Sequence, residues 1–253
     1  GSENDVSLAL QALESIQADG AGPGNHIGLS AIPNCNPDGQ RDLSAGYPPT
    51  GEFFYSVEEP EKRYLWRWIC FQAPSLILEL RSGESVSWRS NDAGSRLASA
   101  LAGSEGLVEN GSLVAALVTG SPDGLGPIPG LRLTSPPESL DGELGNLWKL
   151  LSDQPSLREA SPARQVLEAR SARPYLEVAH ILASVYGYQL DPVNYTQGVG
   201  ISGRLQLHKL SNAGESPAPG IVDLVEPYVS GSTPMFGERA GGANLAGLIW
   251  GQE

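Results

Sequence analysis

Short apolar runs alternate with helical stretches in the first half of this chain, and that alternation constrains its fold more than any other feature. Apolar side chains with helical spacing indicate amphipathic helices, and short apolar runs between turn-rich segments have the length of buried strands. The predicted elements are helix 6–16, strand 27–32, helix 59–73, strand 76–80, helix 92–102 and strand 113–118. This order predicts an α/β domain with a mainly parallel sheet that is covered by helices.

A cluster of glycine and proline residues over 120–137 ends this alternation, and strand signals fade beyond it. Helices joined by short loops then indicate antiparallel hairpins in an all-α segment. We therefore expect a domain over 1–134, a connecting helix and linker over 135–160, and helical hairpins over 161–253. The later helices are predicted at 138–152, 162–186 with a break at Pro174, 194–210, 220–229 and 243–250.

The chain carries a formal net charge of −13, and acids outnumber bases in both parts. Without a Lys/Arg-rich stripe to neutralise phosphates, neither nucleic acid nor an anionic membrane is expected as a partner. The longest apolar run is far shorter than the roughly 20 residues needed to cross a bilayer. A soluble, cytoplasmic protein is favoured, and secretion stays open because a leader could have been removed. Cys35 and Cys70 are expected to be free, buried thiols, with one disulfide as the alternative.

Residues 32–39, Ile-Pro-Asn-Cys-Asn-Pro-Asp-Gly, form the most specific short string in the sequence. Physically, it is a strand that ends in a tight turn, where Asn and Asp bond the backbone and Gly supplies unusual dihedral angles. The string also resembles the strand-to-loop element of the zinc carboxypeptidases. Two looser matches follow in that family's order, at residues 42–48 and 79–82. The resemblance implies a carboxypeptidase-like α/β fold. The candidate ligand-binding residues in the first string are Asn36 and Asp38.

The zinc site that this resemblance implies is incomplete. In the family, zinc is held by a His-x-x-Glu pair and by the histidine of an Asp-Leu-His-Ser string. Glu3 is the candidate for the carboxylate of the pair, as a relic expected to be vacant, and Arg81 stands where the later histidine would be. A guanidinium stays protonated and has no lone pair for a metal. Ser44 and Ala45 replace the Asn-Arg pair that would grip a substrate carboxylate. We therefore expect no cofactor, with zinc as the alternative.

Two roles for Arg81 stay open. It can pair with an acid such as Glu79, Glu84 or Glu3, so that its own charge fills the position of the metal. It can instead bind a small anionic ligand or an acidic oligosaccharide at the carboxyl end of the sheet, where α/β proteins usually bind ligands.

Residues 195–205, Tyr-Thr-Gln-Gly-Val-Gly-Ile-Ser-Gly-Arg-Leu, form a second motif. Each of its glycines costs a helix about 1 kcal/mol relative to Ala, and we expect close approach of other helices in return. The string is similar to the first helical hairpins of the unsaturated glucuronyl and rhamnogalacturonyl hydrolases. That resemblance implies the start of an α/α barrel. Tyr195 and Trp250 are candidates for stacking on a sugar ring, and core packing is the alternative role for both.

These patterns predict a fragment of a polysaccharide-degrading protein that contains no complete active site. A degenerate carboxypeptidase-like domain would be fused to the start of a glycoside hydrolase-like barrel. The alternatives are an active zinc hydrolase that residues outside this chain complete, and a non-enzymatic interaction module that shares only folds with these families.

Overall fold

The chain folds into two compact units, Gly1–Ser171 and Ala172–Glu253. Within the described residues, the first unit is mixed α/β and the second is helical. The structure is a computed structural model that describes residues 2–18, 27–35, 46–49, 60–119, 125–190, 193–211, 214–236 and 241–249.

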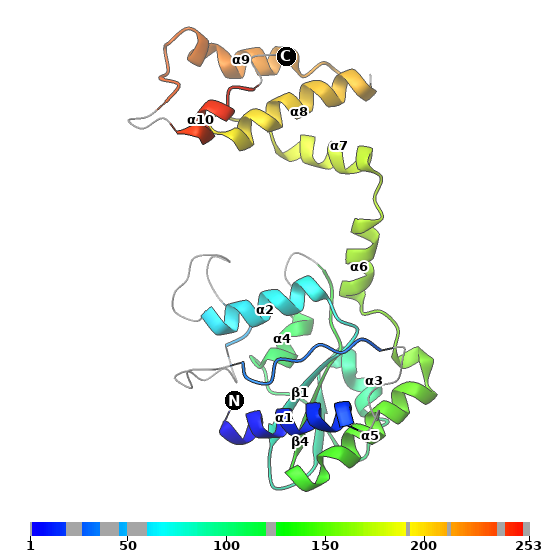
Figure 1. Cartoon of the computed structure of the whole chain (residues 1–253). Coiled ribbons are helices and arrows are strands. Elements are labelled where there is room, and N and C mark those ends of the chain that lie inside the picture. The colour runs from blue at the N-terminus through cyan, green and yellow to red at the C-terminus, as the bar shows by residue number, and fades with distance from the viewer. Residues whose placement is uncertain are drawn as a thin grey trace. The chain divides into compact units, whose positions relative to one another are not determined.

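Among the described residues, strands occur only in the first unit (Figure 1). Its strands are β1 (Ile77–Ser82), β2 (Ser87–Ser90), β3 (Ser104–Leu107) and β4 (Gly130–Ser135). Its α-helices are α1 (Glu3–Ala18), α2 (Pro60–Gln72), α3 (Ser95–Ala98), α4 (Leu113–Thr119), α5 (Pro137–Asp153) and α6 (Pro162–Ser171). Two short 3₁₀ turns are η1 (Asp92–Gly94) and η3 (Pro155–Leu157). The helices of the second unit are α7 (Tyr175–Val185), α8 (Tyr195–Ser211), α9 (Ala218–Val229) and α10 (Gly242–Ala246).

The described strands form one sheet in the order β1-β4-β2-β3. β1 pairs with β4 in parallel and β2 pairs with β3 in parallel, whereas β2 and β4 run antiparallel. The sheet is therefore mainly parallel, as the sequence predicts, with one antiparallel seam at its centre. Side chains alternate between the two faces of a strand. The register places Leu80 beside Leu133 on one face and Glu79 beside Arg132 on the other.

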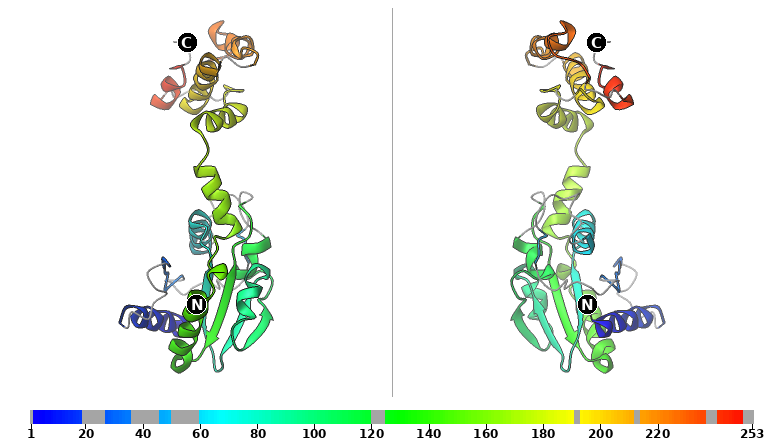
Figure 2. Two further views of the ribbon diagram at one scale, coloured as in Figure 1. Left: turned by 90° about the vertical axis from the view of Figure 1, so that its right-hand side faces the viewer. Right: turned by 90° about the vertical axis from the view of Figure 1, so that its left-hand side faces the viewer.

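The apolar face of the sheet packs against α1, α3 and α5 (Figures 1 and 2). Trp88 of β2 is fully buried there, and its indole N–H donates to Glu143 Oε2 of α5 at 2.8 Å. Burying each large apolar side chain contributes about 1.5–3 kcal/mol, so this layer contributes strongly to the stability of the unit. The leucines of α5 repeat with helical spacing and are all buried: Leu140, Leu144, Leu147 and Leu151.

The opposite face of the sheet is apolar only where β1 and β4 begin. There, α2 and α4 form a second cluster that includes Trp66 and Leu117, and Ile77 of β1 packs against it. Further along the same strands, this face carries charged and hydroxyl side chains instead. The candidate site lies on the polar part of this face.

Segment 113–118 is part of helix α4 and does not form the predicted strand. A short apolar run fits a buried strand or a buried helix equally well, so periodicity alone could not separate the two. Local hydrogen bonds favour the helix, because Ser112 Oγ accepts from the Ala115 N–H at 3.3 Å in the manner of an N-cap. The buried Asn91 side chain then donates to Val114 O at 2.9 Å and holds α4 in place.

Residues 27–35 form neither a helix nor a strand, so the strand predicted at 27–32 is also wrong. Ile27 packs against the first core, but residues 28–32 are exposed. A strand needs a hydrogen-bonded neighbour, and among the described residues β1 pairs only with β4.

β4 and α5 belong to the first unit, although the sequence suggested a domain end at residue 134 and a connection over 135–160. β4 crosses residue 134 as an inner strand, and α5 fills the first core. The glycines and prolines before β4 obscured it, because they extended an apparent loop over the strand. The two units divide between Ser171 and Ala172.

In the second unit, two glycines of α8 allow close backbone approach, as predicted. A Cβ on Gly198 would lie 2.3 Å from Gly247 O, and a Cβ on Gly200 would lie 2.7 Å from Gly187 N. Gly203 differs, because a Cβ there would meet nothing within 4 Å. The core of this unit is small and consists mainly of Leu190, Val193, Ile201, Ile221 and Val225.

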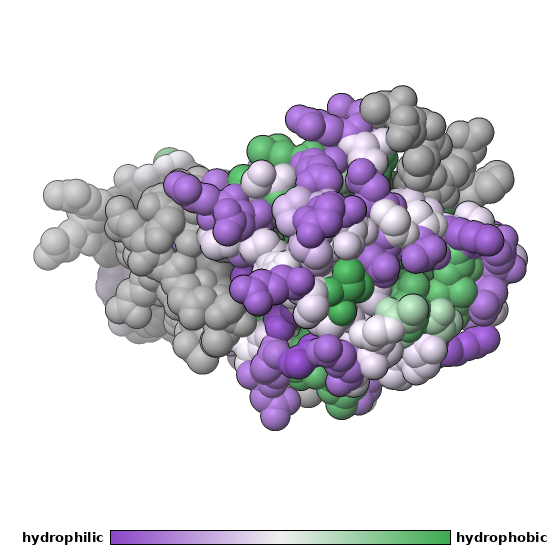
Figure 3. Space-filling view, turned by 90° about the horizontal axis from the view of Figure 1, so that it is seen from below, coloured by the Kyte–Doolittle hydropathy of each residue, from purple (hydrophilic) through white to green (hydrophobic). Residues whose placement is uncertain are grey.

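The face drawn in Figure 3 is mostly hydrophilic, with small and separate apolar patches. Among the described residues, no helix has both the length and the apolar character that a membrane span requires.

Candidate functional site

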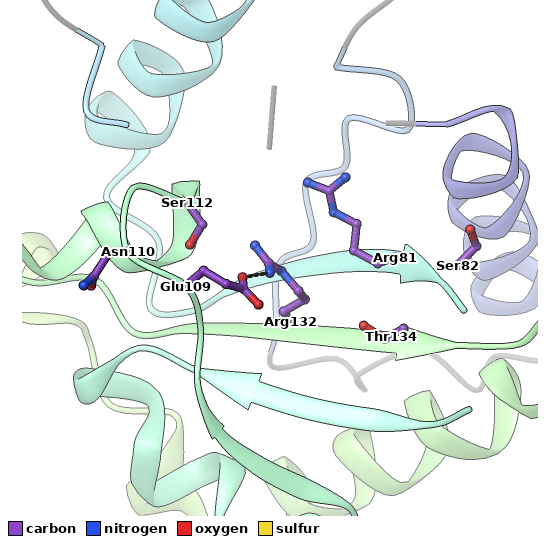
Figure 4. Close-up of a pocket in the computed structure, with 7 residues that line it drawn as sticks. All are labelled: Arg81, Ser82, Glu109, Asn110, Ser112, Arg132 and Thr134. Carbon is purple, nitrogen blue, oxygen red and sulfur yellow. Dashed lines mark hydrogen bonds and ion pairs between the residues drawn. The ribbon is translucent and has the colours of Figure 1, made fainter. Parts of the chain in front are cut away.

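A hollow of about 370 Å³ opens on the charged face of the sheet, toward the ends of β1 and β4 (Figure 4). That volume lies near the lower end of the range for small-molecule sites. In Figure 4 the side chains of Arg81 and Arg132 rise from one side of the sheet, and Ser112 lies on that same side with its hydroxyl directed back toward the sheet. The lining residues come from β1, β4 and the segment between β3 and α4: Arg81, Ser82, Glu109, Asn110, Ser112, Arg132 and Thr134.

Glu79 holds both arginines of the hollow. Its Oε1 accepts from Arg81 Nε at 2.9 Å and from Arg81 Nη2 at 2.6 Å, and its Oε2 accepts from Arg132 Nε at 2.8 Å. The side chains of Glu79 and Arg132 are only 14% and 12% exposed. Burial acts to lower the pKa of Arg132, but the charges and hydrogen bonds of Glu79 and Glu109 together outweigh it, so that pKa lies above its usual value. Arginine stays charged in proteins, and the contacts with Glu79 fix the orientation of both guanidiniums.

Glu109 is the second acid on Arg132, and it also accepts from Arg89 Nη1 at 2.7 Å. Hydrogen bonds from its own backbone N–H and from Arg132 lower the pKa of Glu109 despite partial burial. Arg89 in turn contacts Glu105 at 3.3 Å. Acids and arginines therefore alternate across the whole sheet, in the order Asp5, Arg81, Glu79, Arg132, Glu109, Arg89 and Glu105.

Asp5 connects α1 to the end of β1. Its Oδ1 accepts from the Ser82 N–H at 2.7 Å and from the Ser82 hydroxyl at 3.1 Å, and its Oδ2 lies 3.6 Å from Arg81 Nη1. Burial acts to raise the pKa of Asp5, but the hydrogen bonds from Ser82 and Ser2 bring that pKa below its usual value. Asp5 therefore keeps its charge and fixes the rim of the hollow.

Several donors in the hollow have no hydrogen-bond acceptor within the described part of the chain. Arg132 Nη2 and Arg81 Nη1 have no hydrogen-bond acceptor among the described residues, although the second forms the ion pair with Asp5. Ser112 Oγ accepts from the Ala115 N–H, but its own O–H has no acceptor within the described part of the chain. Guanidinium N–H groups and hydroxyls are the donors that bind carboxylates. The hollow is therefore suited to an anion.

The described residues contain no group of three His, Cys, Asp or Glu side chains that could hold a metal ion. Arg81, at the position where the resemblance implies a zinc ligand, is engaged by Glu79 and Asp5 instead. The pairing with Glu79 is one of those the sequence suggested, whereas the second partner is Asp5 and not Glu3 or Glu84. Glu3 begins α1 and is exposed.

Tyr195 is not among the residues that line this hollow. Tyr195 is the first residue of α8 in the second unit, and it is 57% exposed. Asn36, Asp38 and Trp250 lie outside the described residues.

Cys35, the last described residue of the first string, lies near enough to Glu79 and Arg81 for their charges to act on its thiol. Burial raises the pKa of the Cys35 thiol, and the Glu79 carboxylate adds to that rise while Arg81 opposes it. Neither Cys35 nor Cys70 takes part in a disulfide; Cys70 is buried, as the sequence predicts, whereas Cys35 is only half-buried.

Arg132, Glu109, Ser112 and Thr134 were missed by the sequence reasoning. One signal was present, because Leu131-Arg132-Leu133-Thr134 alternates apolar and polar side chains with the period of a strand. The nearness of Glu109 to Arg132 had no local signal, since it depends on how β3 and β4 are placed in the sheet.

No protein-family model matches this chain, and no curated protein or solved structure matches it significantly.

Proposed function

We propose that the first unit is a non-catalytic binding module that holds a small carboxylate-bearing ligand, such as an acidic sugar, in the hollow beside β1 and β4. One observation carries the proposal: Arg81 and Arg132 line one hollow, and each keeps a guanidinium nitrogen without a hydrogen-bond acceptor among the described residues. The residues that line the hollow include two arginines and one acid, Glu109, whereas the whole chain has a net charge of −13.

Hydroxyl and amide groups around the arginines support a hydroxylated ligand. Ser112 and Thr134 offer hydroxyls, and Asn110 offers both an amide donor and a carbonyl acceptor. A uronic acid has one carboxylate and several hydroxyls on a ring of a size that this volume accepts.

The wider proposal follows from the two sequence resemblances. The module would be a carboxypeptidase-like domain without its zinc site, in a polysaccharide-degrading protein whose helical part is similar to the start of an α/α-barrel glycoside hydrolase. An acidic oligosaccharide from such a polymer would then supply the ligand. Zinc chemistry is not part of the proposal, because the guanidinium of Arg81 cannot ligate a metal.

The test is calorimetric titration of the full chain with glucuronate, with glucose as the neutral control and inorganic phosphate as a second anion. We expect saturable binding of glucuronate, weaker binding of phosphate and none of glucose. Arg132→Gln should weaken glucuronate binding at least about tenfold, since a hydrogen bond to a charged group contributes about 1.5–3 kcal/mol. Arg96→Gln is the matched control, because Arg96 contacts Ser156 and does not line the hollow.

Failure of glucuronate to bind, or equal weakening by both substitutions, would contradict the proposal. Tighter binding of phosphate than of glucuronate would contradict its carboxylate part. One-to-one zinc binding at micromolar concentration, together with peptidase activity, would favour the zinc hydrolase instead.

A further inference from the structure

We infer that Glu109 is an internal carboxylate that occupies part of the binding site, and that an incoming ligand carboxylate takes its place on Arg132. The inference rests on the proposed function and adds to it which group pairs with Arg132 before a ligand binds and why the site selects an anion.

The two acids bound to Arg132 are held very differently. Glu79 is largely buried, belongs to β1 and is fixed by hydrogen bonds to both of its carboxylate oxygens. Glu109 lies in the segment between β3 and α4, and its side chain is 58% exposed. Exposed ion pairs contribute little to stability because water competes for both charges. Glu109 is therefore the partner that can leave.

The geometry of Arg132 shows which of its N–H donors would become available if Glu109 moved away. Arg132 uses Nε for Glu79 and Nη1 for Glu109, while Nη2 has no acceptor among the described residues. When Glu109 moves away, Nη1 and Nη2 become a pair of parallel donors. A carboxylate that binds both nitrogens forms the bidentate contact that is stronger than a single charged hydrogen bond.

Charge balance explains why only an anion would complete this exchange. Arg89 and Arg132 are direct cross-strand neighbours on β2 and β4, and Glu109 bridges them. Like charges in such positions repel each other. A ligand carboxylate replaces the negative charge that Glu109 withdraws, whereas a neutral sugar would leave the two arginines facing each other.

The test compares Glu109→Gln with Glu105→Gln in the full chain. Each substitution neutralises an acid that is paired with Arg89. Both side chains are about half exposed, Glu109 at 58% and Glu105 at 49%. Only Glu109 lines the hollow. Glucuronate affinity is measured by calorimetry at constant ionic strength, and thermal unfolding of each variant confirms that it is folded.

We expect Glu109→Gln to tighten glucuronate binding about three- to tenfold, because the internal competitor is gone, and Glu105→Gln to change it less than twofold. An equal gain in both variants would overturn the inference, since long-range charge alone would then account for it. Weaker binding by Glu109→Gln would also overturn it and would make Glu109 a positioning residue, while the proposed function would stand. Absence of binding in the wild type and in both variants would refute the proposed function itself.

Discussion

Arg89 on β2 and Arg132 on β4 stand directly opposite each other across the antiparallel seam of the sheet. Two like charges at this position would destabilise the pairing of the strands. Glu109 lies between them, and its two carboxylate oxygens each accept from one arginine. Because it binds both arginines, this one exposed acid reduces the repulsion between them across the two strands.

We predict that Glu109→Gln lowers the free energy of unfolding by about 0.5–1 kcal/mol, the usual scale of a cross-strand charge pair. Glu105→Gln should have a smaller effect, because Glu105 contacts Arg89 alone. Urea denaturation at low and high salt would measure both, and the difference between the variants should shrink as salt screens the charges. A Glu109→Gln variant as stable as the wild type at low salt would contradict the bridging role.

A second prediction concerns pH and the link between α1 and β1. The pKa of Asp5 is lowered in the folded protein from its ordinary value of 3.8, so its carboxylate stabilises the fold above about pH 4. That stabilisation is lost as the pH falls through the folded-state pKa.

Asp5→Asn should therefore lower the free energy of unfolding at pH 7 by about 1 kcal/mol, and the difference from the wild type should shrink below pH 4. Glu3→Gln is the matched control, because Glu3 lies on the same helix turn and is exposed. Urea midpoints at pH 7 and pH 3 measure both variants. A difference between Asp5→Asn and the wild type that does not change with pH would argue against this account.

Much of the fold could be predicted from the sequence, and the limits have physical causes. The helices with clear apolar stripes, such as α5 and α9, follow from periodicity alone. β3 could not be found this way, since all of its residues are exposed and none of them needs an apolar side chain. Segment 113–118 is too short for its period to be measured, and its helix depends on distant partners such as Asn91.

The candidate site was predictable only in part. Arg81 was identified because it stands where the resembling family has the histidine of its Asp-Leu-His-Ser string. Its pairing with Glu79 follows from their spacing of two residues on one strand face. Arg132 lies about fifty residues further on, and only the pairing of β1 with β4 brings it beside Glu79. Sequence spacing contains no information about that register.

A third prediction uses the two kinds of glycine in α8. Gly198→Ala should destabilise the second unit by about 1–3 kcal/mol, the usual cost of overpacking, because the new methyl group would overlap the backbone at Gly247. Gly203→Ala should stabilise the same helix by up to about 1 kcal/mol, since that position is open. Hydrogen exchange of the α8 amides would measure both effects, and equal effects of the two substitutions would contradict the packing described here.

A fourth prediction concerns α7. No residue of this helix is buried, although it carries exposed apolar side chains such as Leu182 and Val185. Exposed apolar patches promote association, so residues 172–253 expressed alone should self-associate. Replacing Leu182 and Val185 by lysine should reduce that association in size-exclusion chromatography with light scattering. A monodisperse monomer of the unmodified segment, with strongly protected amides throughout, would mean that the helical part is complete as it stands.

The central claim is that Arg81 and Arg132 together bind a ligand carboxylate, and their own side-chain signals test it most directly. The Nε–H resonances of the arginines can be followed by ¹H–¹⁵N NMR of the full chain during titration with glucuronate, with glucose as the control. We predict saturable shifts of the Arg81 and Arg132 resonances with glucuronate alone, while Arg96 and Arg164, which do not line the hollow, stay unchanged. Equal small shifts of all arginines, or no shift of Arg81 and Arg132, would contradict the claim.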